Sequence, residues 1–252
     1  GIHTGAPAAD LIRLVDNLGM DSISLGTTIA YVLDYNARHP EQPLFNGATF
    51  GDHAKIRELI EQAGRGQLPQ VGHGVKRLAD GMNEPGYAMH VKGLELPAYI
   101  PDTNPGYAWA IAGGHMTMAT FMLLALQGDT SLDYWVDAIT QKGLYQVRDD
   151  LLGSCKFAGM NHGMALTALK EATGMELSQE ELLAAVRRAF LRGLALEAKQ
   201  GYEDDDYTLP AQVFEDPNAN LSTPNFITPE FFSALKERVW AVFRPEMEQL
   251  SA

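Results

Sequence analysis

The chain has 252 residues and a net charge of −13, from 19 Lys and Arg against 32 Asp and Glu. So negative a surface repels phosphate backbones and anionic lipid, and we expect neither nucleic acid nor a membrane surface as a partner. The composition, 46% hydrophobic and 20% charged, is typical of a globular protein, and the length allows one large domain or two smaller ones.

The cysteine count bears on the expected cellular compartment, and the first residue bears on whether the chain is a fragment. Cys155 is the single cysteine, which excludes an intrachain disulfide and favours the reducing environment of the cytoplasm. The longest apolar stretch, residues 111–126, has polar breaks and is too short for a bilayer, so we expect a buried helix there. The chain opens on Gly1 rather than Met, and we expect it to be a piece of a longer polypeptide.

Helical spacing of apolar residues dominates the first half of the chain. It predicts helices over residues 7–18, from Asp21 or Ser22 onward, over 52–63 and over 72–79. Residues 89–99 alternate weakly between apolar and polar, but Pro97 and Pro101 favour an ordered loop over a strand.

The second half is also helical. Two predicted helical blocks cover residues 131–143 and residues 155–172. A long helix is predicted from a capping box at Ser178 and Glu181 to about Gln200. Thr228 and Pro229 precede the last predicted helix, Glu230–Phe243. Residues 208–227 have no clear period and are expected to pack irregularly. The fold class is therefore all-α. We expect two intertwined helical domains, residues 1–128 and 129–252, each holding one copy of a repeated motif.

That motif reads Asp-x-x-Gly-x-(Asp/Cys), and it runs from Asp16 through Gly19 to Asp21 and from Asp150 through Gly153 to Cys155. Each copy follows an apolar helical stretch, where a glycine can turn the chain sharply. A carboxylate held there can accept two parallel N–H bonds from a flat edge, such as a guanidinium or the aminopyrimidinone of a pterin. The alternative is two helix ends with incidental acids.

Several other fragments accompany the motif in a fixed order. They are DNLGMDSISLG (16–26), Gly51-Asp52, Arg65-Gly66, residues 73–81, VKGLELPAY (91–99), DLLGSCKF (150–157) and DDYTLP (205–210). This series resembles the tungsten-containing aldehyde ferredoxin oxidoreductase family. The resemblance covers roughly residues 1–210 and implies the C-terminal helical domains of that family, domains 2 and 3.

The resemblance implies a role for each motif residue that matches. Asp16, Asp21 and Asp150 would hydrogen-bond the two pterins of a tungsten bis-pterin cofactor, and Met20 and Ser154 would add backbone contacts. These roles come from the family and not from the spacing.

The resemblance also makes Cys155 the fourth ligand of a 4Fe-4S cluster, whereas a lone cysteine is otherwise usually a buried, inert residue. The family's other three cluster cysteines and its N-terminal domain would precede Gly1. We therefore expect this fragment alone to bind no cofactor and to be inactive.

His115 is the candidate catalytic residue. It lies in the sequence AIAGGHMTMAT (110–120), where many family members have Ser-x-Arg-Gly-x-x-His, and the family's histidine aligns without a gap with Met118. Gly113 and Gly114 would let a ligand approach, and an imidazole there could move a proton near neutral pH. The alternative is a core histidine bonded to a backbone carbonyl.

The resemblance implies a tungstopterin oxidoreductase that converts an aldehyde to a carboxylic acid and passes electrons through the cluster to ferredoxin or a related carrier. The expected partners are that carrier, the small-molecule aldehyde and the missing N-terminal domain, and a homo-oligomer is compatible with the sequence. One alternative is a reductive family member acting on an aromatic acyl thioester. Another is a non-catalytic helical docking module. The acidic run 203–206 is interpreted as a solvated turn.

Overall fold

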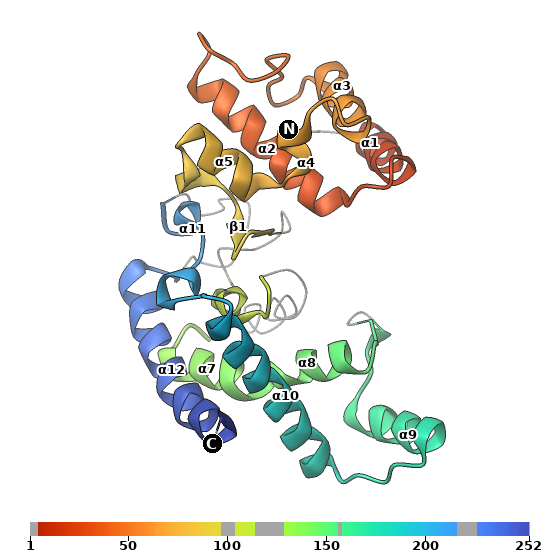
Figure 1. The fold of residues 1–252 in the computed structure, drawn as a ribbon, viewed down its shortest axis with the longest axis vertical. Coiled ribbons are helices and arrows are strands. Elements are labelled where there is room, and N and C mark those ends of the chain that lie inside the picture. The colour runs from red at the N-terminus through yellow and green to blue at the C-terminus, as the bar shows by residue number, and fades with distance from the viewer. Residues whose placement is uncertain (1–4, 97–103, 114–128, 156–157, 216–225, 252) are drawn as a thin grey trace. The chain divides into compact units, whose positions relative to one another are not determined.

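The computed structural model describes residues 5–96, 104–113, 129–155, 158–215 and 226–251 (Figure 1). Helices dominate these ranges, in which the regular strands are a single pair, each two residues long. The structure therefore confirms the all-α prediction. The chain divides into two units: residues 1–101 with 209–216, and residues 102–208 with 217–252. The predicted domain boundary at residue 128 stays a prediction. Within the described ranges no helix has the length and apolar character needed to span a bilayer.

The first unit is a small helical bundle. Its elements are α1 (Gly5–Asn17), α2 (Ser22–Arg38), α3 (His53–Gly64), α4 (Pro69–Gly72), α5 (Val75–Met82), the 3-10 turn η1 (Pro85–Tyr87) and α11 (Ala211–Glu215). Apolar residues of α1 to α5 form one core, in which Leu11 and Val15 are the buried stripe of α1. Of the two predicted cap residues, Asp21 and Ser22, the structure has Asp21, which caps α2 by accepting the Ser24 N–H at 2.7 Å.

The segment expected to be an ordered loop contains a minimal β-hairpin, so that expectation was wrong for residues 90–95. Strands β1 (His90–Val91) and β2 (Leu94–Glu95) pair antiparallel, with His90 opposite Glu95 and Val91 opposite Leu94. Lys92 and Gly93 between them both have positive φ, 53° and 87°. Two such residues form the tight turn whose twist matches a hairpin.

Glu95 joins this hairpin to the helices. It is 4% exposed, and its Oε1 accepts the Val75 N–H at 2.7 Å and the Thr28 hydroxyl at 3.5 Å. Val75 is the first residue of α5, so the carboxylate satisfies an amide at the positive end of that helix. The buried charge therefore links β2 with α2 and α5.

The second unit packs longer helices around aromatic residues. Its elements are η3 (Pro105–Trp109), α7 (Leu132–Asp137), the π-helical turn η5 (Ala138–Lys142), α8 (Leu144–Leu151), α9 (His162–Thr173), α10 (Gln179–Lys199), η7 (Asp204–Asp206) and α12 (Pro229–Ser251). Helix α10 packs against α8 and α12, and α12 packs against α7 (Figure 1). The rings of Phe190 of α10 and Phe243 of α12 pack edge to face, with their centroids 5.5 Å apart. The predicted capping box of Ser178 and Glu181 begins α10.

Several predicted elements differ from the structure in their bounds or their type. The block 155–172 becomes helical at His162, because Asn161 caps the helix by accepting the Met164 N–H at 2.9 Å. The predicted helix 72–79 is divided by Gly74, whose φ of 88° interrupts it, so that α5 starts at Val75. Helix α12 continues past Phe243 to Ser251 with Pro245 inside it, and the aperiodic stretch 208–227 contains α11.

Candidate cofactor site

The first copy of the motif ends helix α1 in a defined turn. The Gly19 N–H donates to the Asp16 carbonyl at 3.0 Å, and the Met20 N–H donates to the Val15 carbonyl at 3.2 Å. Gly19 has φ of +71°, which a glycine adopts without strain. These two bonds and the left-handed residue make a Schellman turn. The turn leads from α1 directly into Asp21, the cap of α2.

The second copy ends helix α8 in the same turn. The Gly153 N–H donates to the Asp150 carbonyl at 3.1 Å, the Ser154 N–H donates to the Asp149 carbonyl at 2.8 Å, and Gly153 has φ of +66°. Asp150 thus matches Asp16, and Cys155 matches Asp21. The repeated sequence pattern is therefore also a repeated backbone structure.

The motif side chains that would hold a cofactor are accessible. Asp16, Asp21, Asp150 and Cys155 are exposed, and Met20 and Ser154, at the position after each glycine, are half-buried. Exposed carboxylates with two oxygens each suit the N–H edge of a pterin, and an exposed thiol suits iron. Because the copies lie in different units, the structure describes each copy without placing them around a common ligand.

Cys155 is the one cysteine of the sequence, whereas a 4Fe-4S cluster takes four thiolates. In the parts of the chain that the structure describes, no group of three or more His, Cys, Asp and Glu side chains could hold a metal ion.

His115 and Met118 lie outside the described residues, and so do most of the buried helix expected over 111–126. Ala112, three residues before His115 in the sequence, is held by a buried carboxylate. Glu197 of α10 is 3% exposed, and it accepts the Ala112 N–H at 2.6 Å and the Tyr207 hydroxyl at 2.9 Å. Burial, followed by the charge of Glu197, raises the pKa of Tyr207.

Sequence reasoning missed a buried charged group beside the second motif copy. Arg148 precedes the buried Asp149, and its guanidinium donates to that carboxylate, to the Met160 carbonyl and toward the His162 ring. Burial, and secondarily the charge of Arg148, lowers the pKa of His162. The adjacent Arg-Asp pair was the available sequence signal, but both residues read as the polar side of an amphipathic helix.

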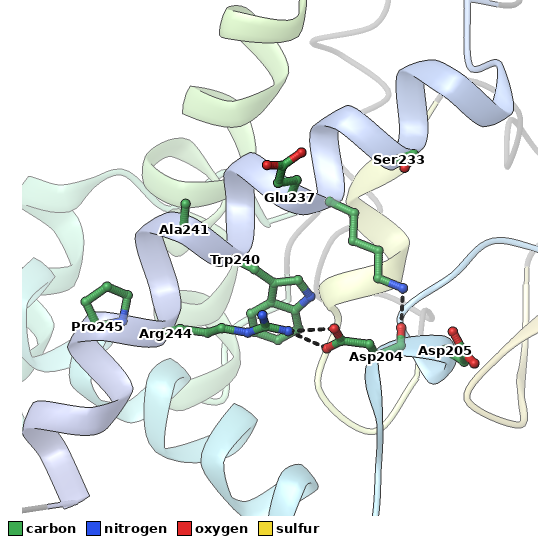
Figure 2. Close-up of a pocket in the computed structure, with 9 residues that line it drawn as sticks. Asp204, Asp205, Ser233, Glu237, Trp240, Ala241, Arg244 and Pro245 are labelled. Atoms are coloured by element: carbon green, nitrogen blue, oxygen red, sulfur yellow. Dashed lines mark hydrogen bonds and ion pairs between the residues drawn. The ribbon is translucent and has the colours of Figure 1, made fainter.

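A separate pocket of about 620 Å³ lies between the acidic run and helix α12, and Figure 2 shows the side chains around it. Arg244 donates to both carboxylate oxygens of Asp204, at 2.5 and 2.7 Å, and the Lys236 ammonium donates to the Asp204 carbonyl. The Arg244 hydrogen bonds lower the pKa of Asp204. Residues 203–206 form an exposed turn, as predicted, and its Asp204 is already paired.

Comparison with known proteins extends the resemblance found in the sequence. A family model described as aldehyde ferredoxin oxidoreductase, domains 2 & 3, matches residues 1–241. A tungsten-containing aldehyde ferredoxin oxidoreductase of Pyrococcus furiosus is 28% identical over 240 residues, and one of Pyrococcus abyssi is 27% identical over 241 residues. Each alignment covers 86% of this chain and 39% of the relative.

The corresponding Pyrococcus horikoshii protein is 32% identical over 122 residues, which are 44% of this chain and 20% of the relative. The chain thus spans 39% of the length of the two curated relatives that it matches along most of its own length.

Proposed function

Because the chain belongs to the aldehyde ferredoxin oxidoreductase family, where it corresponds to domains 2 and 3, we propose that the intact protein is a tungstopterin oxidoreductase. In the proposed reaction an aldehyde and water give a carboxylic acid, two protons and two electrons. The electrons leave through a 4Fe-4S cluster to ferredoxin or a related carrier. A cytoplasmic location follows from the same proposal, since such a cluster and a free thiol both suit a reducing compartment.

The observation that carries this proposal is the repeated Schellman turn. Two helices in different units, α1 and α8, end in the same pair of backbone hydrogen bonds, and each turn has an exposed aspartate at its start. A cofactor with two similar pterins needs two similar acceptors. We assign Asp16, Asp21 and Asp150 to the pterin edges, with backbone contacts from Met20 and Ser154.

Cys155 takes the position that Asp21 has in the first copy, and we assign it to the cluster as one thiolate ligand. When bound, the tungsten centre supplies the redox chemistry and the cluster supplies the path for electrons. The chain's own contribution is to orient the pterins and to hold one ligand of the cluster.

His115 is proposed to handle the proton at the substrate. The buried Glu197 holds the backbone at Ala112, which lies three residues before His115 in the sequence. An imidazole titrates near neutral pH, so it can accept a proton as the aldehyde is oxidised.

The test uses the full-length protein that contains this chain. We expect stoichiometric tungsten and iron by elemental analysis, and aldehyde-dependent reduction of ferredoxin. Asp16→Ala or Asp150→Ala removes a charged acceptor worth about 1.5–3 kcal/mol per bond, so tungsten retention should weaken by about 10- to 150-fold.

The matched control is Asp10→Ala, an exposed acid on the same helix as Asp16 whose side chain is 66% exposed. It should leave the metal content unchanged. Full tungsten occupancy in both motif variants would make the acids ordinary helix ends. Absence of tungsten from the unmodified protein would favour the docking module instead.

A further inference from the structure

A buried arginine connects the two sides of the segment that carries Cys155. The Arg148 side chain is 4% exposed, and its Nε and one terminal nitrogen donate to Asp149 Oδ1 at 2.8 and 2.5 Å. The same terminal nitrogen donates to the Met160 carbonyl at 2.5 Å, and the other lies 2.9 Å from His162 Nδ1. One guanidinium therefore holds residues on both sides of Cys155 in the sequence.

The first motif copy shows what this arginine replaces. A Schellman turn is usually accompanied by an apolar contact between the residue after the glycine and the residue five positions earlier. In the first copy these are Met20 and Val15, and Met20 packs against the apolar core that includes Val15. In the second copy they are Ser154 and Asp149. The turn is the same, but both positions of the usual apolar contact are polar, and Asp149 pairs with Arg148 instead.

A buried ion pair often stabilises the folded state no more than an apolar contact of similar volume. Removing two charges from water costs free energy that their attraction roughly offsets, and losing one partner leaves the other charge unpaired. The arrangement also requires arginine, because the guanidinium serves a carboxylate, a carbonyl and an imidazole at once through its fixed fork of donors. A lysine ammonium is a point charge on a flexible stem and cannot reproduce that fork.

We propose that Arg148 is a positioning residue for Cys155, because it fastens Asp149, before the cysteine, to Met160 and His162, after it. The inference rests on the proposed function in one respect, that Cys155 is the cluster ligand. Arg148 then acts on the cluster through the backbone and without contact with the reacting atoms.

The first test needs no cofactor, because it measures amide hydrogen exchange in the 252-residue chain. Arg148→Met should speed exchange of the Ser154 amide, which bonds Asp149 O, by at least about tenfold. The Met20 amide, which bonds Val15 O in the equivalent turn, should keep its rate. Arg148→Lys keeps the charge, and should still speed exchange at Ser154 because the fork is lost; it carries the test if the Met variant fails to fold.

Arg187→Met is the matched control in the same unit. Arg187 also joins a carboxylate to a carbonyl, with Nε and one terminal nitrogen both 2.6 Å from Glu246 and the other 2.7 Å from the Thr140 oxygen. Its loss should leave exchange at Ser154 unchanged. An unchanged Ser154 rate in the Arg148 variants, or an equal rise in the Arg187 variant, overturns the proposal.

The second test separates this inference from the proposed function in the full-length protein. Arg148→Lys should shift the cluster's midpoint potential and electron paramagnetic resonance signal while tungsten content stays unchanged. Cys155→Ser is the reference variant and should lose iron. If Cys155→Ser keeps its iron and its signal, the proposed ligand role fails, whereas the exchange result still decides whether Arg148 positions the segment. If only Cys155→Ser has an effect, the positioning role fails alone.

Discussion

A methyl group at residue 74 is expected to displace the buried carboxylate that joins the hairpin to the helices of the first unit. A Cβ on Gly74 would lie 2.6 Å from Glu95 Oε1, the atom that accepts the Val75 N–H. Gly74 also has φ of 88° and ψ of 165°, a region that residues other than glycine rarely adopt, at a cost of about 1–3 kcal/mol. Losing a buried hydrogen bond to a charged group adds about 1.5–3 kcal/mol. Gly74→Ala should therefore destabilise the protein by about 2.5–6 kcal/mol.

The assay is urea unfolding followed by circular dichroism, with Gly66→Ala as the matched control. Gly66 also has positive φ, 72°, but a Cβ there would meet no atom within 4 Å, so we expect backbone strain alone, about 1–2 kcal/mol. In a Glu95→Ala background the carboxylate is gone, and Gly74→Ala should then cost only its backbone term. The coupling between the two substitutions should be about 1.5–3 kcal/mol. Free energies that add within about 0.5 kcal/mol would refute the proposed clash.

Three further predictions concern the cofactors, the candidate catalytic residue and acid stability. The 252-residue chain made alone should contain neither iron nor tungsten, because Cys155 is one thiolate where a cluster takes four; stoichiometric metal by elemental analysis and visible absorption would contradict this. In the full-length enzyme His115→Gln should keep the metals yet lose about 10²–10⁴-fold in turnover with an altered pH–rate profile, whereas near-normal turnover would make His115 a core residue. The Arg187 hydrogen bonds lower the pKa of Glu246, so the folded state binds that proton more weakly than the unfolded chain. The stabilisation from ionised Glu246 is present above the ordinary carboxyl pKa and is lost as pH falls through the lowered pKa of the folded state. Glu246→Gln removes this ionisation, so the urea midpoint of the variant should decline less between about pH 5 and about pH 3.

The elements that could be predicted from sequence are those set by neighbouring residues. The start of α2 at Asp21 and the capping box at Ser178 depend on side chains within three positions, and the structure confirms both. Each motif copy likewise ends a helix through two local bonds: the glycine N–H bonds the carbonyl three positions before it, and the N–H of the next residue bonds the carbonyl five positions before that residue. Local chemistry was enough to predict these features.

The features that escaped prediction depend on contacts between distant parts of the chain. The hairpin at 90–95 has Lys92 where the usual turn signal is asparagine or aspartate. In the sequence Glu95 has the pattern of a surface acid, and its burial depends on hydrogen bonds from the distant Val75 and Thr28. Arg148 reads as a surface residue because its partners at Met160 and His162 are 12 and 14 positions away. In each case a buried charge was found only when its partners were known.

The candidate site divides in the same way. The sequence motif predicted two similar helix ends, and the structure confirms their common geometry. The roles of Asp16, Asp150 and Cys155 stay predictions, because they concern groups that bind from outside the backbone turn. His115 stays a prediction for a different reason, since it lies outside the described residues.

The order of the segments along the chain constrains how the protein can be synthesised and folded. Helix α11 contacts η1 within the first unit, but it follows residues 102–208 of the second unit in the sequence. During translation, the ribosome must therefore make most of the second unit before the first can receive its last helix. The two units cannot mature one after the other as independent domains usually do. A stop codon between them would leave an incomplete first unit, and exchanging one unit between relatives would require grafting two separate stretches of sequence.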